Sequence, residues 1–268
     1  MASAPSWDFI AKLVCIGDSG CGKSSLTIRL CEGRFVTHHD VTIGVEFGSR
    51  IVPVGPPHSN SNAPSSIPPP SDGSISAGLP EPRTKPSTNS PPADRQKHMK
   101  LSLWDTAGQE TYKSVTRSYF RGASGALLVF DLSRKQTFQH AIDWLNDLRQ
   151  IAEPDIVVVL VGNKADLAKP GAVDGDAGEN KREVTREEAE EWARRNGVLE
   201  YVETSAKSGE NVEKAFMRVA ERIYENIQAG KYDLNDRRSG VKAPSAGGAG
   251  SRLVGLTNDK SKASGACC

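Results

Sequence analysis

The chain has 268 residues, and its 34 lysines and arginines nearly balance 33 aspartates and glutamates to give a formal net charge of +1. Because domains commonly span about 100–200 residues, this length allows one or two domains. The near-neutral charge argues against a wholly basic nucleic-acid-binding protein, and no nucleic-acid partner is expected. The five cysteines form no C-x-x-C pair and follow no secretory signal, so a disulfide framework is not expected.

Short apolar segments alternate with amphipathic ones along most of the chain. Several apolar segments carry no polar residue on either face, which is typical of strands buried on both sides of a sheet. The alternation predicts a doubly wound α/β domain with a mainly parallel sheet and helices on both faces. In chain order, strands are expected at Ile10–Ile16, Val45–Val54, Met99–Trp104, Gly125–Phe130, Ile156–Val161 and Leu199–Glu203, and helices at Lys23–Cys31, Phe138–Ile151, Arg186–Arg195 and Val212–Gln228.

Two segments interrupt this pattern. Twelve of the 16 prolines and nine serines fall within the 45 residues 53–97, which have too few apolar side chains to fold. Residues 237–268 carry six basic residues against one acid among many Gly, Ala and Ser, and are expected to form a flexible tail. The longest apolar runs are far shorter than the about 20 residues that span a bilayer, so any membrane contact requires an anchor.

The first expected strand is followed by GDSGCGKSS, Gly17–Ser25, which matches the phosphate-binding pattern G-x-x-x-x-G-K-[ST] in its required strand–loop–helix context. The glycines let the backbone close around phosphate oxygens, and the loop N–H groups and the start of the following helix bind the anion. Lys23 is expected to contact the β- and γ-phosphates, and Ser24 to bind Mg²⁺. The complete spacing disfavours the alternative of a chance glycine-rich turn.

A second motif, WDTAGQE at Trp104–Glu110, follows the third expected strand. Asp105 lies at the end of that strand, where its carboxylate can hold magnesium directly or through water. Gly108 can offer an unhindered N–H to a γ-phosphate, and Gln109 can orient a water for in-line attack. An ordinary surface loop is the weaker interpretation beside a phosphate-binding loop.

The segment NKAD, Asn163–Asp166, follows the fifth expected strand and indicates which base is bound. Asp166 can accept hydrogen bonds from the ring N–H and the exocyclic amine of guanine, a donor pair that adenine lacks. The Asn163 amide can bridge loops, the stem of Lys164 can lie over the ring, and Ser205–Lys207 can direct a backbone N–H at the guanine carbonyl. The nucleotide is therefore expected to be GTP or GDP.

These motifs, together with TIGVEF at 42–47 and YFRGASGALLVFDL at 119–132, resemble the Ras-like small GTPases and specifically the Rab family. The resemblance covers about residues 9–241 without the proline-rich insert. It implies the P-loop NTPase fold of small G proteins, with a six-stranded, mainly parallel sheet and helices on both faces. GVEFGSR and IQAGKYDLNDRRSGVK are similar to the Rab subgroup that works at the Golgi and at early or recycling endosomes.

The resemblance also implies roles for individual residues. Thr42 would contact Mg²⁺ and the γ-phosphate, Phe35 would stack on guanine, and Gln109 would be the catalytic residue that positions the hydrolytic water. An aromatic triad would be read by effectors, although periodicity alone favours the core for those three side chains. Nucleotide contacts are expected from Ser19, Gly20, Cys21, Gly22, Lys23, Ser24, Ser25, Phe35, Thr42, Gly108, Asn163, Lys164, Asp166, Ser205, Ala206 and Lys207, magnesium contacts from Ser24, Thr42 and Asp105, and effector contacts from Ile43, Gly44, Val45 and the triad Phe47, Trp104 and Tyr119.

The implied function is a GTP-hydrolysing, membrane-anchored switch in vesicle-mediated transport, with GTP or GDP and Mg²⁺ as cofactors. Hydrolysis is expected to be slow without a GTPase-activating protein, because no motif places an arginine at the phosphates. The adjacent Cys267 and Cys268 resemble a Rab geranylgeranylation signal, and two lipid chains give a stable anchor. This monomer is expected to bind an exchange factor, a GTPase-activating protein, a GDP-dissociation inhibitor, a Rab escort protein with geranylgeranyl transferase, and effectors, at the cytoplasmic face of Golgi or early/recycling endosomal membranes.

The expected organisation is an N-terminal extension (1–8), a GTPase domain (9–230) and a flexible tail (231–268). The disordered insert, residues 56–96, falls in the turn between the second and third strands, where loop closure costs little more as length grows, so the fold should survive it. An inert linker or a retained intron is favoured over a binding segment. The insert lies between the two switch regions, which the resemblance places around Thr42 and Gly108. One alternative is therefore a nucleotide-binding module whose regulators the insert blocks. A small-molecule kinase is disfavoured because NKAD and SAK indicate guanine.

Overall fold

The computed structural model describes residues 7–37, 40–56, 95–168, 180–234, 236 and 239–243. Most of the insert and the two adjacent cysteines, Cys267 and Cys268, lie outside these residues. Disorder of the insert and lipidation of the cysteines therefore stay predictions. None of the helices in the described part of the chain is both long and apolar enough to cross a bilayer.

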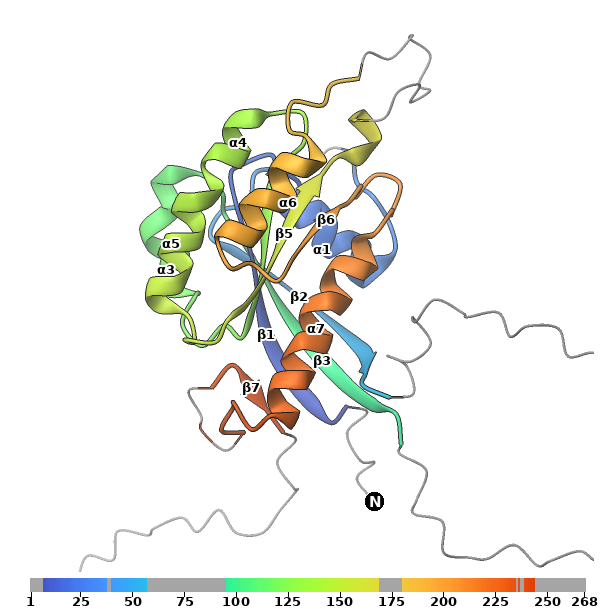
Figure 1. Ribbon diagram of the computed structural model, residues 1–268, viewed down its shortest axis with the longest axis vertical. Helices are drawn as coiled ribbons and strands as arrows, with labels where there is room; N and C mark the ends of the chain where they lie inside the picture. Colours follow the sequence, from blue (N-terminus) through green and yellow to red (C-terminus); the bar gives the residue numbers. More distant parts are fainter. Residues whose placement is uncertain are drawn as a thin grey trace, which may run out of the picture.

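In the part of the chain that the structure describes, seven strands, one more than expected, form a single mixed sheet with helices on both of its faces (Figure 1). The order is β2-β3-β1-β4-β5-β6, and β7 lies beside β1. Neighbouring strands are parallel except in two pairs, β2–β3 and β1–β7, which are antiparallel. The strands are β1 (Phe9–Ile16), β2 (Val45–Val54), β3 (Lys97–Thr106), β4 (Gly125–Asp131), β5 (Val157–Asn163), β6 (Glu200–Glu203) and β7 (Val241–Lys242).

Two separate layers of helices cover the sheet. Helices α1 (Lys23–Glu32) and α7 (Val212–Gln228) pack on one face, and their apolar side chains form one core cluster with the strands. Helices α4 (Lys135–Gln139), α5 (Ala141–Ile151) and α6 (Arg186–Arg195) form the second cluster on the other face. The short helix α3 (Lys113–Ser118) and two 3-10 turns, η1 (Glu110–Tyr112) and η2 (Ala165–Leu167), complete the described helical segments.

The buried central strands confirm the predicted fold class. Every residue of β4 and of β5 is buried, as the continuous apolar sequences of both strands predict. In α7 the residues at helical spacing, among them Phe216, Val219 and Ile223, are fully buried against the sheet. All six expected strands are present, and the domain is doubly wound with a mostly parallel sheet.

Two helical segments differ from the prediction. The expected helix Phe138–Ile151 consists of α4 and α5, which meet at His140. Residues on both sides of that junction, such as Phe138 and Ala141, are buried in the same cluster, so apolar periodicity does not reveal it. Helix α3 is not predicted, because only Thr116 of its six residues is buried and it has no apolar stripe.

The ends of the domain also differ from the expected boundaries. Asp8 belongs to the sheet edge, since its carboxylate accepts from the His98 N–H at 2.9 Å. The expectation that all residues after 230 form a flexible tail is wrong for β7, whose Val241 is fully buried and pairs with Ala11. Because β4 pairs with β1 only from Leu13 onward, the first half of β1 has a free edge that β7 fills.

The insert joins the sheet at the end of the β2–β3 hairpin that is remote from the switch segments. The register pairs Val45 with Thr106 at one end of the hairpin and Val54 with Lys97 at the other, where the insert enters. That end lies beside the first residues of β1 and near β7 (Figure 1). Gln96, expected to be disordered, closes the hairpin by donating to the Val54 carbonyl at 2.9 Å. The insert lies between the switches along the sequence, but its described ends do not lie beside them.

Candidate functional site

A pocket of about 420 Å³ opens at the carboxyl ends of the parallel strands. This is where open α/β sheets bind ligands, and the volume suits a small organic molecule. The loops after β1, β3, β5 and β6 all contribute to it, together with the segment between α1 and β2. The lining residues are Ser19, Gly20, Gly22, Lys23, Ser24, Ser25, Phe35, Val36, Thr37, Val41, Thr42, Thr106, Gly108, Asn163, Lys164, Asp166, Leu167, Ala206 and Lys207.

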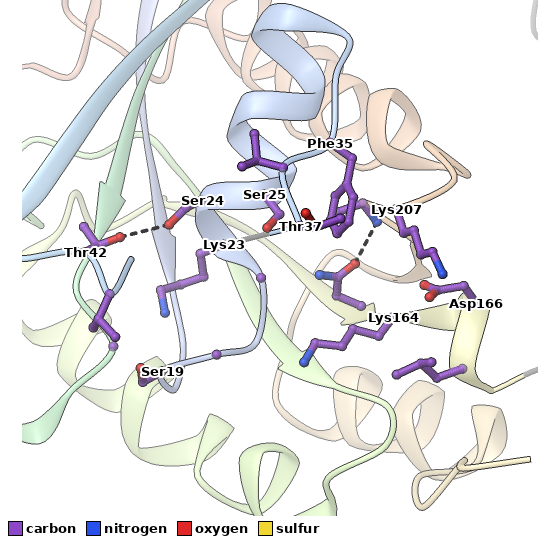
Figure 2. A pocket seen from close by; sticks show the side chains of 18 of the residues that line it. Ser19, Lys23, Ser24, Ser25, Phe35, Thr37, Thr42, Lys164, Asp166 and Lys207 are labelled. Carbon is purple, nitrogen blue, oxygen red and sulfur yellow. Dashed lines mark hydrogen bonds between the residues drawn. The ribbon is translucent and has the colours of Figure 1, made fainter. Parts of the chain in front are cut away.

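The pocket has two chemically different ends. Figure 2 shows Lys23, Ser24 and Thr42 together at one end, and Phe35, Asp166 and Lys207 at the other. The first end offers an ammonium, two hydroxyls and the start of a helix, which suit phosphates and a hard cation. The second offers an aromatic ring, a carboxylate and lysine stems, which suit a base. The pocket therefore fits a nucleotide lying along its length.

The loop Gly17–Ser24 takes the shape that its glycines allow. Gly17, Gly20 and Gly22 have φ values of 135°, 74° and 90°, which side chains rarely tolerate. A Cβ at Gly22 would also lie 2.3 Å from the Asn163 amide nitrogen, and one at Gly17 would lie 2.0 Å from the Val129 carbonyl oxygen. The loop is thus a tightly fitted cradle and not an ordinary turn, as the motif predicts.

Lys23 and the start of α1 supply positive charge to this cradle. The Lys23 ammonium donates to the carbonyls of Gly17 and Asp18, both at 2.8 Å. Burial lowers the pKa of Lys23, and the negative charge of Asp105 opposes that shift. Helix α1 has neither a side-chain cap nor an acidic residue in its first turn. Its first N–H groups therefore remain available for an anion.

Ser24, Thr42 and Asp105 come together at the phosphate end. The Ser24 hydroxyl donates to Asp105 Oδ2 at 2.5 Å and lies 2.9 Å from the Thr42 hydroxyl (Figure 2). Asp105 Oδ1 is buried and has no hydrogen-bond partner among the described residues, and burial raises the pKa of this carboxyl to about 6. Two hydroxyls and an unpartnered carboxylate oxygen are the ligands that Mg²⁺ prefers, so the predicted magnesium residues fit that ion.

Asn163 connects three loops around the pocket: its own NKAD segment, the phosphate loop and the segment after β6. Its amide nitrogen donates to the Cys21 carbonyl at 2.8 Å, and its amide oxygen accepts from the Thr204 hydroxyl and the Ala206 N–H, both at 3.2 Å. The predicted bridging role of Asn163 is therefore present in the structure. Because the Ala206 N–H is used in this way, a backbone N–H of Ser205–Lys207 directed at guanine stays a prediction.

The base end is arranged around Asp166 and Lys164. One Asp166 carboxylate oxygen accepts from the Ser205 hydroxyl at 2.6 Å, which fixes the carboxylate at the pocket wall. Lys164 has a left-handed φ of 68°, and its ammonium lies 2.7 Å from Asp131 Oδ2. Ser205 itself does not line the pocket, so it acts through Asp166.

Three further predicted residues do not line the pocket: Asp105, which reaches it through Ser24, and Cys21 and Gln109. Cys21 is fully buried, and burial raises the pKa of its thiol, so it contributes its carbonyl and not a reactive sulfur. Gln109 is half-buried and follows Gly108 in the chain, but only Gly108 lines the pocket. The Gly108 carbonyl accepts from the Ser19 N–H at 3.0 Å, which holds the WDTAGQE loop against the phosphate loop.

Arg29 stabilises the base end of the pocket, a role that no sequence motif predicts. Its guanidinium donates to the carbonyls of Ala206 at 2.9 Å and Gly33 at 2.7 Å, and also to the carbonyl of Lys207. It therefore ties the segment Ser205–Lys207 to the end of α1, just before Phe35. An arginine within an amphipathic helix carries no local signal for contacts with residues 177 and 178 positions away, so only the folded chain shows this role.

The aromatic residues expected at an effector surface lie side by side, with Phe47 exposed and Trp104 and Tyr119 half-buried. Phe47 and Trp104 have ring centroids 4.4 Å apart, and Trp104 and Tyr119 are 5.6 Å apart. Phe47 is 66% exposed and the nearby Ile43 is 78% exposed. The core position that periodicity favours for these aromatics is therefore wrong for Phe47. Gly44 and Val45 are half-buried between these two exposed side chains.

Comparison with known families supports the same site. The sequence model of the Ras family matches residues 12–60 and 87–225, which is well over half of the chain. Every residue that lines the pocket falls within the matched ranges.

Proposed function

Because this chain belongs to the Ras family of small GTPases, we propose that it works as a Rab-type switch that recruits effectors to a transport membrane while GTP is bound. Small GTPases of this family bind GTP and GDP, typically with Mg²⁺, and hydrolyse GTP. The Rab role, vesicle-mediated transport and the regulators named below are the proposal.

The geometry supports GTP hydrolysis in the following way. Lys23 and the N–H groups of the phosphate loop hold the phosphate chain, while Asp166 and Phe35 select and cover the base. Mg²⁺, when bound by Ser24, Thr42 and Asp105, would neutralise charge on the β- and γ-phosphates. Gln109 is one residue beyond Gly108 at the pocket wall, from where we infer that it orients the attacking water.

The observation that carries the Rab proposal is the cluster of Phe47, Trp104 and Tyr119. Phe47 lies on β2, five residues after Thr42, whose hydroxyl is 2.9 Å from that of Ser24. Binding of a γ-phosphate by Thr42 would therefore order the backbone that presents Phe47. A large exposed aromatic beside such a segment is suited to an effector that distinguishes the two nucleotide states.

Stimulation by a GTPase-activating protein is also part of the proposal. No arginine is among the residues that line the pocket within the described part of the chain. Arg134 comes near the phosphate loop, but it contacts the Ser19 carbonyl from outside the pocket. An arginine supplied by a partner would stabilise the transition state and raise the hydrolysis rate by orders of magnitude.

The remaining partners and the location follow from the same proposal. We infer an exchange factor, a GDP-dissociation inhibitor and a Rab escort protein with geranylgeranyl transferase, acting on a monomer. Geranylgeranylation of Cys267 and Cys268 would hold the chain at the cytoplasmic face of Golgi or early/recycling endosomal membranes. The alternative of a module whose regulators are blocked by the insert is less favoured, because the described ends of the insert lie at the far end of the hairpin.

The test compares Phe47→Ala with Ile51→Ala. Both are exposed side chains of β2 that point to the same side of the sheet, at 66% and 41% exposure, but only Phe47 contacts Trp104. With the chain loaded with a non-hydrolysable GTP analogue, binding to a panel of purified Rab effectors is measured by calorimetry. We expect one or more effectors to bind, and Phe47→Ala to weaken that binding at least tenfold while Ile51→Ala changes it less than threefold.

Failure of every Rab effector to prefer the GTP form would overturn the Rab proposal, while GTP hydrolysis by the same preparation would still support the Ras-family assignment. The mass of the intact protein from cell membranes tests the anchor. A gain equal to two geranylgeranyl groups is expected, and Cys267→Ser with Cys268→Ser should abolish both the gain and the membrane association.

A further inference from the structure

Asp131 is a buried carboxylate to which the sequence analysis assigns no role. It is the last residue of β4, its side chain is 1% exposed, and both of its oxygens are engaged. Oδ1 accepts from the Ser133 N–H at 2.9 Å and the Ser133 hydroxyl at 2.7 Å. Oδ2 accepts from Arg134 Nε at 2.9 Å and from the Lys164 ammonium at 2.7 Å. One carboxylate oxygen therefore holds two cations.

The two cations serve different parts of the nucleotide pocket. Lys164 belongs to NKAD and lines the base end. Arg134 extends in the opposite direction, and its Nη2 donates to the Ser19 carbonyl at 3.1 Å and lies 3.8 Å from Cys21 Sγ. The base segment and the phosphate loop, which follow different strands, are thus connected through one buried oxygen.

Arg134 lies directly against the phosphate loop. A Cβ built at Gly20 would lie 3.4 Å from Arg134 Nη2, an ordinary van der Waals contact, so the guanidinium packs on the loop at this glycine. Arg134 does not line the pocket, and it contacts the outer side of the loop, whose inner side faces the pocket. It would therefore act on a bound nucleotide by holding the loop in place and not by direct contact.

We propose that Arg134, anchored by Asp131, is a positioning residue that couples the base-binding Lys164 to the phosphate loop and thereby slows the release of guanine nucleotide. The proposal rests on nucleotide binding by the pocket. The contact requires arginine because Nε pairs with Asp131 while Nη2 reaches Ser19. A lysine has one ammonium and cannot extend both ways from the same position.

The test measures release of a fluorescent GDP analogue from the full chain after addition of excess unlabelled GDP. We expect Arg134→Ala to speed release about fivefold, the effect of losing one hydrogen bond and its partner charge. Arg134→Lys should speed release nearly as much, because it keeps the charge beside Asp131 but loses the contact with Ser19. Arg186→Ala, which removes a surface pair with Glu190 on α6, is the matched control and should leave release unchanged.

Two further measurements separate positioning from a general loss of structure. The association rate of the GDP analogue and the single-turnover rate of GTP hydrolysis should change less than twofold in Arg134→Lys. In a double-mutant cycle, the effects of Arg134→Ala and Asp131→Asn on release should be less than additive, and the effect of Asp131→Asn that remains in Arg134→Ala reports the loss of the Lys164 contact. If Asp131→Asn does not fold, Arg134→Lys and Arg134→Ala still decide the outcome.

Release at the wild-type rate in Arg134→Ala would overturn the proposal. So would wild-type behaviour of Arg134→Lys, because charge alone would then account for the effect. Failure of the wild-type chain to bind the GDP analogue would instead contradict nucleotide binding itself, so the two failures are distinguishable.

Discussion

Three aspartates, Asp105, Asp131 and Asp166, lie near the carboxyl ends of strands and contribute to the site. Their roles differ because each has different partners. Burial raises the pKa of Asp105 to about 6, although the Ser24 hydrogen bond and the Lys23 charge oppose that shift. Burial also acts to raise the pKa of Asp131, but the hydrogen bonds from Lys164 and Ser133 outweigh it and lower the pKa. Asp131 is therefore a charged anchor for cations, whereas Asp105 is the carboxylate that gains most from a bound divalent ion.

Asp166 depends on Ser205 in a way that can be tested directly. Ser205→Ala removes the 2.6 Å hydrogen bond that orients the Asp166 carboxylate. Since hydrogen bonds to charged groups are worth about 1.5–3 kcal/mol, we expect GDP affinity to fall about tenfold or more. Titration with a fluorescent GDP analogue measures the change.

Ser208→Ala is the control for this prediction. Ser208 lies in the same loop and is exposed, and its hydroxyl contacts the Glu210 N–H and not Asp166. Its replacement should leave GDP affinity within twofold. Equal losses in both variants would mean that the loop is generally disturbed and that the Ser205 hydroxyl has no special role.

Among the secondary-structure elements, α7 supports the end of the hairpin that carries the insert. The Gly55 N–H donates to Glu221 of α7 at 3.2 Å, and Phe9 of β1 packs edge-on against Tyr224 with ring centroids 6.0 Å apart. Gly55 faces the Tyr224 ring so closely that a Cβ would lie 2.4 Å from the ring carbon Cε1. The hairpin end and α7 therefore form one packed unit.

Two glycines with the same backbone angle test this packing. Gly55 and Gly230 both have φ of 71°, but nothing lies within 4 Å of a Cβ built at Gly230. Gly230→Ala should cost about 1 kcal/mol of unfolding free energy for the left-handed backbone alone. Gly55→Ala should cost about 1–3 kcal/mol more because the methyl group overpacks against Tyr224. Urea unfolding of both variants measures the difference, and equal losses would contradict the proposed contact.

Across the whole molecule, the nucleotide pocket and the insert lie at opposite ends of the β2–β3 hairpin. Both strands have ten residues, and at about 3.3 Å per residue they span about 30 Å. Thr42 lies just before the start of β2, whereas Pro56 and Arg95 are the last described residues on either side of the insert. Nucleotide binding and hydrolysis at the pocket end of the hairpin therefore do not require any particular structure at the end that carries the insert.

Removal of residues 57–94 tests this separation. The shortened chain would join Val54 to Lys97 through Gly55, Pro56, Arg95 and Gln96, a four-residue hairpin loop of a common length. We expect single-turnover GTP hydrolysis and GDP release to stay within twofold of the full chain. The melting temperature should rise by about 4–8 °C, since each halving of a flexible loop lowers its closure cost by about 0.6 kcal/mol. A change of tenfold in either rate would show that the insert acts on the site and would favour the blocked-module alternative.

The sequence alone determined the shape of the phosphate loop, the meeting of Ser24 and Asp105 at its end, the place of NKAD at the pocket wall and the buried central strands. Each of these is encoded locally, by glycines that permit positive φ, by a hydroxyl or carboxylate after a strand, or by an unbroken apolar run. Helix α3 was not predicted because it has almost no apolar face. The junction between α4 and α5 was not predicted because buried side chains continue across it.

Only the tertiary structure decided the contacts between distant segments. It placed Arg29 against Ala206, Arg134 against Ser19 and Val241 against β1. It also put Phe47 on the surface and the ends of the insert far from the switches. The sequence around an arginine or a valine does not indicate which distant residue that side chain contacts. The partner depends instead on how the strands are ordered in the sheet.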